Sequence, residues 1–130
     1  MAAKHNPGFE KIVDSIRHNV TECTVAQVHQ RLQRGDAFHF VDVREDSEVA
    51  VDRAQGAVHL GRGVIERDIE SLVPDKNADL VLYCGGGYRS ALAADSLQKM
   101  GYTNVKSMAG GIRAWREAGL PVETGPVRKL

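Results

Sequence analysis

The run from Leu80 to Tyr83 is apolar at every position, and it constrains the fold more than any other part of the sequence. A strand with one face in water alternates apolar and polar residues, whereas a continuous apolar run is typical of a central strand covered on both faces. Such strands occur in parallel sheets flanked by helices. The run therefore predicts a small α/β domain, with an open, mainly parallel sheet flanked by helices on both faces.

The rest of the chain alternates between strand and helix signals, as this fold requires. Short apolar runs predict strands at residues 38–43, 57–60, 80–83 and 104–108. Helical spacing of apolar residues and capping signals predict helices at residues 24–32, 45–51, 64–72, 91–100 and 112–118. Because each strand but the last is followed by a helix before the next strand, the strands are expected to run parallel.

We expect three parts along the chain. Phe9, Ile12, Val13 and Ile16 recur at helical spacing, so residues 1–19 are expected to be an N-terminal extension with an amphipathic helix. Residues 20–123 are expected to form one folded domain, and residues 124–130 a loose C-terminal tail. A chain of 130 residues buries roughly two-thirds of its unfolded surface without help from a metal or disulfide.

Composition limits the possible partners. Seventeen basic residues balance seventeen acidic ones, so no bulk field draws the protein to nucleic acid or to a membrane. The two cysteines, Cys23 and Cys84, have no zinc-ligand spacing, and the five histidines are scattered, so we expect no metal and no cofactor. No signal-peptide pattern or membrane-length apolar run is present, so a reduced, cytoplasmic protein is expected.

Cys84 follows the apolar run directly and begins a glycine-rich loop that leads into a predicted helix. Three consecutive glycines, Gly85 to Gly87, allow backbone N–H groups to point at one centre, and the helix start adds partial positive charge there. Such a cradle favours an anion, which is either a bound oxyanion or the Cys84 thiolate itself. An unperturbed cysteine is only about 3 percent thiolate at pH 7, so a nucleophilic cysteine needs this kind of support. The loop predicts an enzyme.

Three separated motifs together resemble the rhodanese domain of sulfurtransferases. They are Val41-Asp42-Val43-Arg44-Glu45, the loop from Tyr83-Cys84 to Ser90, and the stretch from Met108 to Val122 with its paired glycines, tryptophan and Gly-Leu-Pro. The resemblance spans about Val20 to Glu123 and implies the open α/β fold expected above. It also implies sulfur transfer through a persulfide on Cys84.

Two sequence details bear on the chemistry. The family usually carries Gly-His-Ile-x-Gly-Ala after its first motif, but this chain has Asp52-Arg53-Ala54-Gln55-Gly56-Ala57, which leaves the role of the histidine unfilled. Related cell-cycle phosphatases use a Cys-x5-Arg loop around phosphate. Here only four residues separate Cys84 from Arg89. A phosphatase is also expected to have a histidine directly before its cysteine, and in this chain that residue is Tyr83. The shorter loop favours a sulfur atom on Cys84 over a phosphate.

The site residues follow from the loop, the sheet edge and the resemblance. Cys84 is the expected nucleophile. Residues expected to bind the sulfur donor are Arg89, Arg44, Gly85, Gly86, Gly87, Tyr88, Ser90 and Arg62. Arg44 is equally consistent with a scaffold role, and Arg62 rests only on its place after a predicted strand. Asp42 is expected to brace the loop and Trp115 to anchor the last helix, while His59 and Cys23 are expected to be structural.

The partners implied are a small sulfur donor, thiosulfate or a persulfide, and a thiol or cyanide acceptor. A sulfur-carrier protein is a further candidate partner, and the oligomeric state is open. Two other functions compete with sulfur transfer. One is a binding or regulatory module with weak activity, and the other is an enzyme that acts on an oxyanion such as arsenate or phosphate.

Overall fold

The computed structural model describes residues 5–130 and places five parallel strands in one sheet, in the order β1-β6-β5-β2-β4. From one edge to the other these are β1 (Thr21–Cys23), β6 (Val105–Met108), β5 (Leu80–Tyr83), β2 (His39–Asp42) and β4 (Val58–His59). The apolar run is therefore the central strand, as predicted. Its neighbours pair with it in register, with Asp42 opposite Tyr83 on one side and Ser107 opposite Leu82 on the other.

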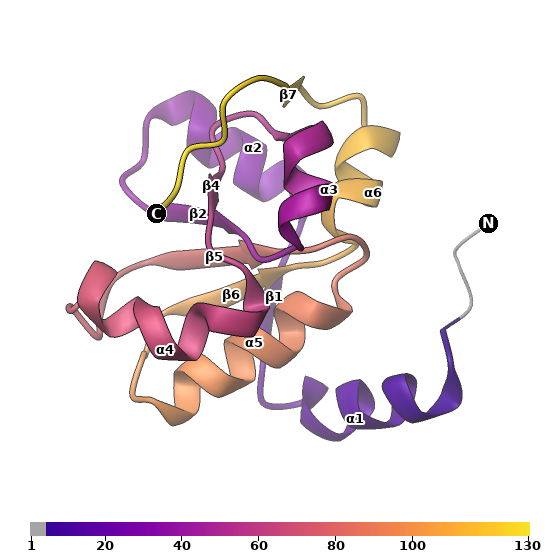
Figure 1. Cartoon of the computed structure of the whole chain (residues 1–130), viewed down its shortest axis with the longest axis vertical. Coiled ribbons are helices and arrows are strands. Elements are labelled where there is room, and N and C mark those ends of the chain that lie inside the picture. Colours follow the sequence, from indigo (N-terminus) through magenta and orange to yellow (C-terminus); the bar gives the residue numbers. More distant parts are fainter. Residues whose placement is uncertain (1–4) are drawn as a thin grey trace.

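Helices cover both faces of the sheet, which confirms the predicted fold class (Figure 1). Below the sheet in this view lie α4 (Arg62–Leu72) and α5 (Tyr88–Lys99), and above it lie α2 (Val25–Arg34), α3 (Asp46–Val51) and α6 (Gly111–Glu117). Because strand residues alternate, β5 sends Leu80 and Leu82 into the core on the α4–α5 side and Val81 and Tyr83 into the core beside α6.

Local signals in the sequence set the ends of α2. Thr24 caps its first turn by accepting a hydrogen bond from the Gln27 N–H at 3.1 Å, and the Gln27 side chain accepts one from the Thr24 N–H at 2.9 Å. This reciprocal capping box satisfies N–H groups that a helix start otherwise leaves unpaired. At the other end Gly35 takes a left-handed conformation, with φ of 74°, which glycine adopts without steric cost.

The amphipathic N-terminal segment forms α1 (Pro7–Arg17) and packs on α5 of its own domain. Val13 is fully buried there. Figure 1 shows α1 running beneath α5, outside the five-stranded sheet. The extension is therefore an added layer on the helix that follows the Cys84 loop.

Three short strands were not predicted. They are β1 at the sheet edge and an antiparallel pair formed by β3 (Arg53–Ala54) and β7 (Val122–Glu123). Strands of two or three residues are too short to show an alternating pattern, so only their tertiary partners define them.

Residues 124–130, expected to be a loose tail, are hydrogen-bonded to the folded domain. His59 on the edge strand β4 accepts a hydrogen bond from the Leu130 N–H at 3.1 Å and donates its own N–H to the Arg128 carbonyl at 2.8 Å. The buried guanidinium of Arg53 donates to the carbonyls of residues 124, 125 and 126 at 2.9–3.1 Å. Arg53 stands where the family usually has histidine, and here it holds the C-terminal segment in place.

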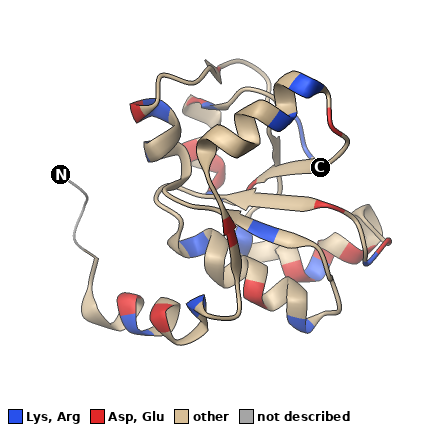
Figure 2. Ribbon diagram, turned by 180° about the vertical axis from the view of Figure 1, so that it is seen from behind, with Lys and Arg blue, Asp and Glu red and all other residues tan. Residues whose placement is uncertain are grey.

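Charged residues of both signs are interspersed along the helices, with no stripe of one sign (Figure 2). This agrees with the balanced net charge. Between residues 5 and 130, none of the helices combines the length and apolar character needed to span a membrane.

Candidate active site

Cys84 lies at the carboxyl end of the central strand, and its sulfur faces the start of α5. The Sγ atom accepts hydrogen bonds from the N–H groups of Gly87, at 3.1 Å, and Ser90, at 3.4 Å. Gly87 precedes the helix with φ of 100° and provides no capping side chain. The sulfur therefore occupies the place of a helix cap, where partial positive charge gathers.

Two buried hydroxyl groups extend this contact into the protein. The Cys84 thiol donates to Ser90 Oγ at 3.5 Å, and Ser90 Oγ lies 2.8 Å from Ser107 Oγ on β6. Both serines are fully buried. Ser90 was expected to bind the donor, but burial turns its hydroxyl toward the sulfur instead of solvent. Ser107 was not predicted, because a single serine in a strand carries no signal of its own.

The start of α6 holds the loop from the other side. Ile112 and Arg113 donate their backbone N–H groups to the carbonyls of Cys84, at 2.9 Å, and Gly85, at 3.1 Å. Gly111 has φ of 55°, and a Cβ there would collide with the Cys84 carbonyl oxygen. The second of the paired glycines is thus required by the close approach of α6 to the Cys84 loop.

Arg89 lies against the loop and forms an ion pair with a glutamate. Its guanidinium forms a bidentate ion pair with Glu48 on α3, and its Nη2 lies 3.1 Å from the position that a Cβ at Gly85 would occupy. Hydrogen bonding to Arg89 lowers the pKa of Glu48, and hydrogen bonding to Glu48 raises the pKa of Arg89. Glu48 was not predicted, since nothing in the sequence links α3 to the loop.

Tyr88 meets the N-terminal extension. Its ring centroid lies 4.1 Å from that of His5 and 5.4 Å from that of Phe9, and the Arg17 guanidinium carbon lies 5.2 Å from the ring centroid. This aromatic cluster makes α1 a neighbour of the loop, because Tyr88 is the first residue of α5.

Arg44 is held by a buried carboxylate. Only 4% of its surface is exposed, and its Nε and Nη2 atoms donate to the buried carboxylate of Asp42 at 2.8–3.1 Å. Nη2 also donates to the Asp52 carbonyl at 2.7 Å. Of the two expectations for Arg44, this geometry fits the scaffold role. His59 is part of the same scaffold, with Nε2 2.8 Å from the Arg44 carbonyl.

Trp115 and Arg62 differ in how they relate to the site. Trp115 is fully buried, and its indole N–H donates to the Pro121 carbonyl at 2.8 Å, which fits the packing role expected for it.

Arg62 begins α4, and its backbone N–H donates to the Val43 carbonyl at 3.0 Å. Within residues 5–130, no hydrogen bond or ion pair joins the Arg62 side chain to the Cys84 loop.

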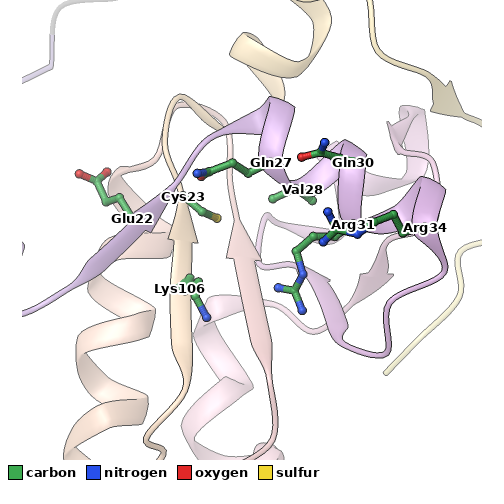
Figure 3. A pocket seen from close by; sticks show the side chains of 8 residues that line it. All are labelled: Glu22, Cys23, Gln27, Val28, Gln30, Arg31, Arg34 and Lys106. Carbon is green, nitrogen blue, oxygen red and sulfur yellow. The ribbon is translucent and has the colours of Figure 1, made fainter.

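Cys23 belongs to a different part of the molecule. It lines a hollow of about 340 Å³ between β1 and α2 (Figure 3). The other lining residues are Glu22, Gln27, Val28, Gln30, Arg31, Arg34 and Lys106. Burial raises the pKa of the Cys23 thiol, and its side chain packs in the core on the α2–α6 side, whereas Cys84 packs on the α4–α5 side. Cys23 is therefore no partner for Cys84.

The sequence of residues 24–118 matches the family model described as the rhodanese-like domain. The chain belongs to the rhodanese-like domain family. The match includes the Cys84 loop and the paired glycines of α6, but not α1.

Two curated relatives of similar sequence are named thiosulfate sulfurtransferases. The chain is 36% identical over 77 residues to thiosulfate sulfurtransferase PspE of Escherichia coli. The aligned region covers 59% of this chain and 73% of PspE. It is 34% identical over 104 residues to thiosulfate sulfurtransferase GlpE of Actinobacillus succinogenes. This aligned region covers 80% of this chain and 91% of GlpE. The chain is thus a member of the sulfurtransferase family.

Solved structures share the rhodanese-like fold. A protein of unknown function from Rhodopseudomonas palustris, described as a possible tyrosine phosphatase, is 30% identical with a TM-score of 0.81, and the match covers 95% of this chain and 99% of that one. A thiosulfate sulfurtransferase from Pseudomonas aeruginosa has a TM-score of 0.82 at 23% identity, covering 93% of this chain and 23% of that one. The second similarity shows the fold alone.

Proposed function

We propose that this protein transfers a sulfane sulfur from a donor such as thiosulfate to a thiol or cyanide acceptor through a persulfide on Cys84. The observation that carries the proposal is the pair of N–H groups, from Gly87 and Ser90, that converge on Cys84 Sγ at 3.1 and 3.4 Å. These donors point at the sulfur of the residue itself, at the start of a helix of 12 residues. Such donors favour the anionic form of the attacking sulfur, the thiolate, over the neutral thiol.

The reaction has two displacement steps. In the first, the Cys84 thiolate attacks the outer sulfur of thiosulfate, a sulfur–sulfur bond forms, and the bond to the sulfonate sulfur breaks. Sulfite leaves with that electron pair, and Cys84 carries a persulfide anion. In the second step, cyanide or a thiolate attacks the terminal sulfur, and the electron pair of the broken bond returns to Cys84. No outside oxidant or reductant is needed when cyanide is the acceptor.

The burial of Cys84 restricts the donors and acceptors. The residue is only 1% exposed, so a donor must present a single protruding sulfur atom to reach it. Thiosulfate, a low-molecular-weight persulfide and a persulfide on a flexible carrier-protein segment all meet this requirement. The names of the relatives, thiosulfate sulfurtransferases in E. coli and A. succinogenes, favour thiosulfate as the first donor to test.

The proposal is tested by measuring thiocyanate formed from thiosulfate and cyanide. The wild type is expected to turn over, Cys84→Ser to be inactive, and Cys23→Ser to match the wild type, because Cys23 lies in a different core region. The Cys23 variant is the matched control, since it also replaces one of the two cysteines with serine. Activity in Cys84→Ser would refute the proposed nucleophile, and an inactive wild type would refute the proposed reaction.

A phosphatase is the second candidate, and the name of the R. palustris protein favours including it. The loop argues against it, because four residues separate Cys84 from Arg89 and two loop N–H groups are already directed at Sγ. We therefore expect no hydrolysis of p-nitrophenyl phosphate above the level of Cys84→Ser. Hydrolysis that depends on Cys84, without thiocyanate formation, would replace sulfur transfer with phosphate chemistry.

A further inference from the structure

Two guanidinium groups lie against the glycines of the Cys84 loop. Arg89 approaches Gly85, and Arg113 approaches Gly86, with Arg113 Nη1 3.6 Å and Cζ 4.0 Å from the position that a Cβ at Gly86 would occupy. Arg113 reaches the loop from the first turn of α6, and its backbone N–H is fixed by the Gly85 carbonyl at 3.1 Å. The start of its side chain is therefore held beside the loop.

The two cations differ in their electrostatic partners. Both Nη atoms of Arg89 are bound to the carboxylate of Glu48, so that pair has no net charge. Arg113 is exposed, and among residues 5–130 its guanidinium forms neither an ion pair nor a hydrogen bond. All of its side-chain N–H donors are therefore available for a ligand beside Gly86.

We propose that Arg113 binds the anionic group of the sulfur donor and so selects small anionic donors, with thiosulfate as the probe. This proposal rests on the proposed sulfur transfer. The guanidinium presents several N–H donors in a plane, which suits the oxygen atoms of a sulfonate. A sulfonate held by Arg113 would lie beside Gly86, two residues after Cys84 in the same loop. Arg89 then serves chiefly to fix Gly85 and α3.

The first test is the dependence of rate on thiosulfate concentration. Arg113→Gln is expected to raise KM for thiosulfate about five- to tenfold, the effect of losing one exposed charge-assisted contact, with kcat within about twofold. Arg113→Lys should recover part of the loss because it keeps the charge. Arg116→Gln is the control, since it removes the same charge from the same helix but its guanidinium pairs with Asp52. The KM of Arg116→Gln is expected to match the wild type.

The second test does not depend on sulfur transfer. In a Cys23→Ser background, the rates at which iodoacetate, an anion, and iodoacetamide, a neutral analogue, alkylate Cys84 are compared. Arg113→Gln is expected to slow iodoacetate several-fold relative to iodoacetamide. If the wild type transfers sulfur but Arg113→Gln changes neither KM nor the alkylation ratio, the role of Arg113 is overturned. If the wild type transfers no sulfur, the proposed function fails, and the proposal that rests on it fails too.

Discussion

The guanidinium of Arg89 holds the carboxylate of Glu48 through two contacts, Nη1–Oε1 at 2.6 Å and Nη2–Oε2 at 3.1 Å. Glu48 also accepts a hydrogen bond from the Glu45 N–H at 3.2 Å, in the first turn of α3. The pair thereby connects the helix after the first motif to the loop that carries the thiol. The positive charge of Arg89, which lies near Gly85, is therefore balanced by the negative charge of Glu48.

Removing Arg89 alone should harm donor binding more than removing both partners. Arg89→Ala leaves the Glu48 carboxylate unpaired beside the loop, where it repels an anionic donor, so KM for thiosulfate should rise about tenfold. The double variant Arg89→Ala with Glu48→Gln removes that repulsion, and its KM should return to within about threefold of wild type. Steady-state kinetics on the two single variants and the double variant measure this coupling. A double variant as impaired as Arg89→Ala would instead assign direct donor binding to Arg89.

The same pair predicts a pH-dependent contribution to stability. Arg89 lowers the pKa of Glu48 in the folded protein, so the pair stabilises the fold fully above the unfolded carboxyl pKa of about 4.3 and loses this effect as pH falls through the lower folded value. The thermal midpoint of wild type should exceed that of Glu48→Gln by a small margin at pH 6. This margin should shrink below about pH 4. It is small because Glu48 is 36% exposed. A margin that grows on acidification would contradict the assignment.

The buried pair of Asp42 and Arg44 should contribute far more to stability than an exposed pair. Arg44→Met leaves the Asp42 carboxylate buried without its partner, which is expected to cost about 3–5 kcal/mol of unfolding free energy. Arg116→Ala breaks the exposed pair with Asp52 and should cost less than about 1 kcal/mol. Urea denaturation measures both. Equal losses in the two variants would show that burial does not distinguish the pairs.

The hydroxyl pair behind the sulfur should affect the chemical step more than donor binding. Ser107→Ala removes a hydrogen-bond partner of Ser90, which contacts Cys84 Sγ, so kcat should fall about fivefold, equivalent to one hydrogen bond, with KM for thiosulfate unchanged. Ser71→Ala, which removes an exposed hydroxyl from α4, is the control. An unchanged kcat in Ser107→Ala would limit this pair to a packing role.

Much of the fold could be predicted because its signals are local. The continuous apolar run of β5 indicated a central strand, and Thr24 with Gly35 indicated the ends of α2. The edge strand β1 and the C-terminal segment could not be predicted. Their structure depends on partners distant in the chain, such as the Arg53 guanidinium that binds the carbonyls of residues 124–126.

In the candidate site too, residues with local sequence signals could be predicted, and residues that reach the loop from distant parts of the chain could not. Cys84 and its glycines could be recognised because strand, loop and helix start are contiguous in sequence. Glu48, Ser107 and Arg113 reach the loop from three other elements, and no local pattern marks them. The two possible roles of Arg44 could be separated only by its burial, which sequence does not report.

The most direct test of the account is mass spectrometry of the intact, reduced protein after thiosulfate treatment and removal of free thiosulfate. The account predicts one added sulfur atom, located on the Cys84 peptide, in both the wild type and Cys23→Ser. It predicts no such adduct in Cys84→Ser. An unmodified wild type, or an added sulfur that persists in Cys84→Ser, would contradict the persulfide on Cys84.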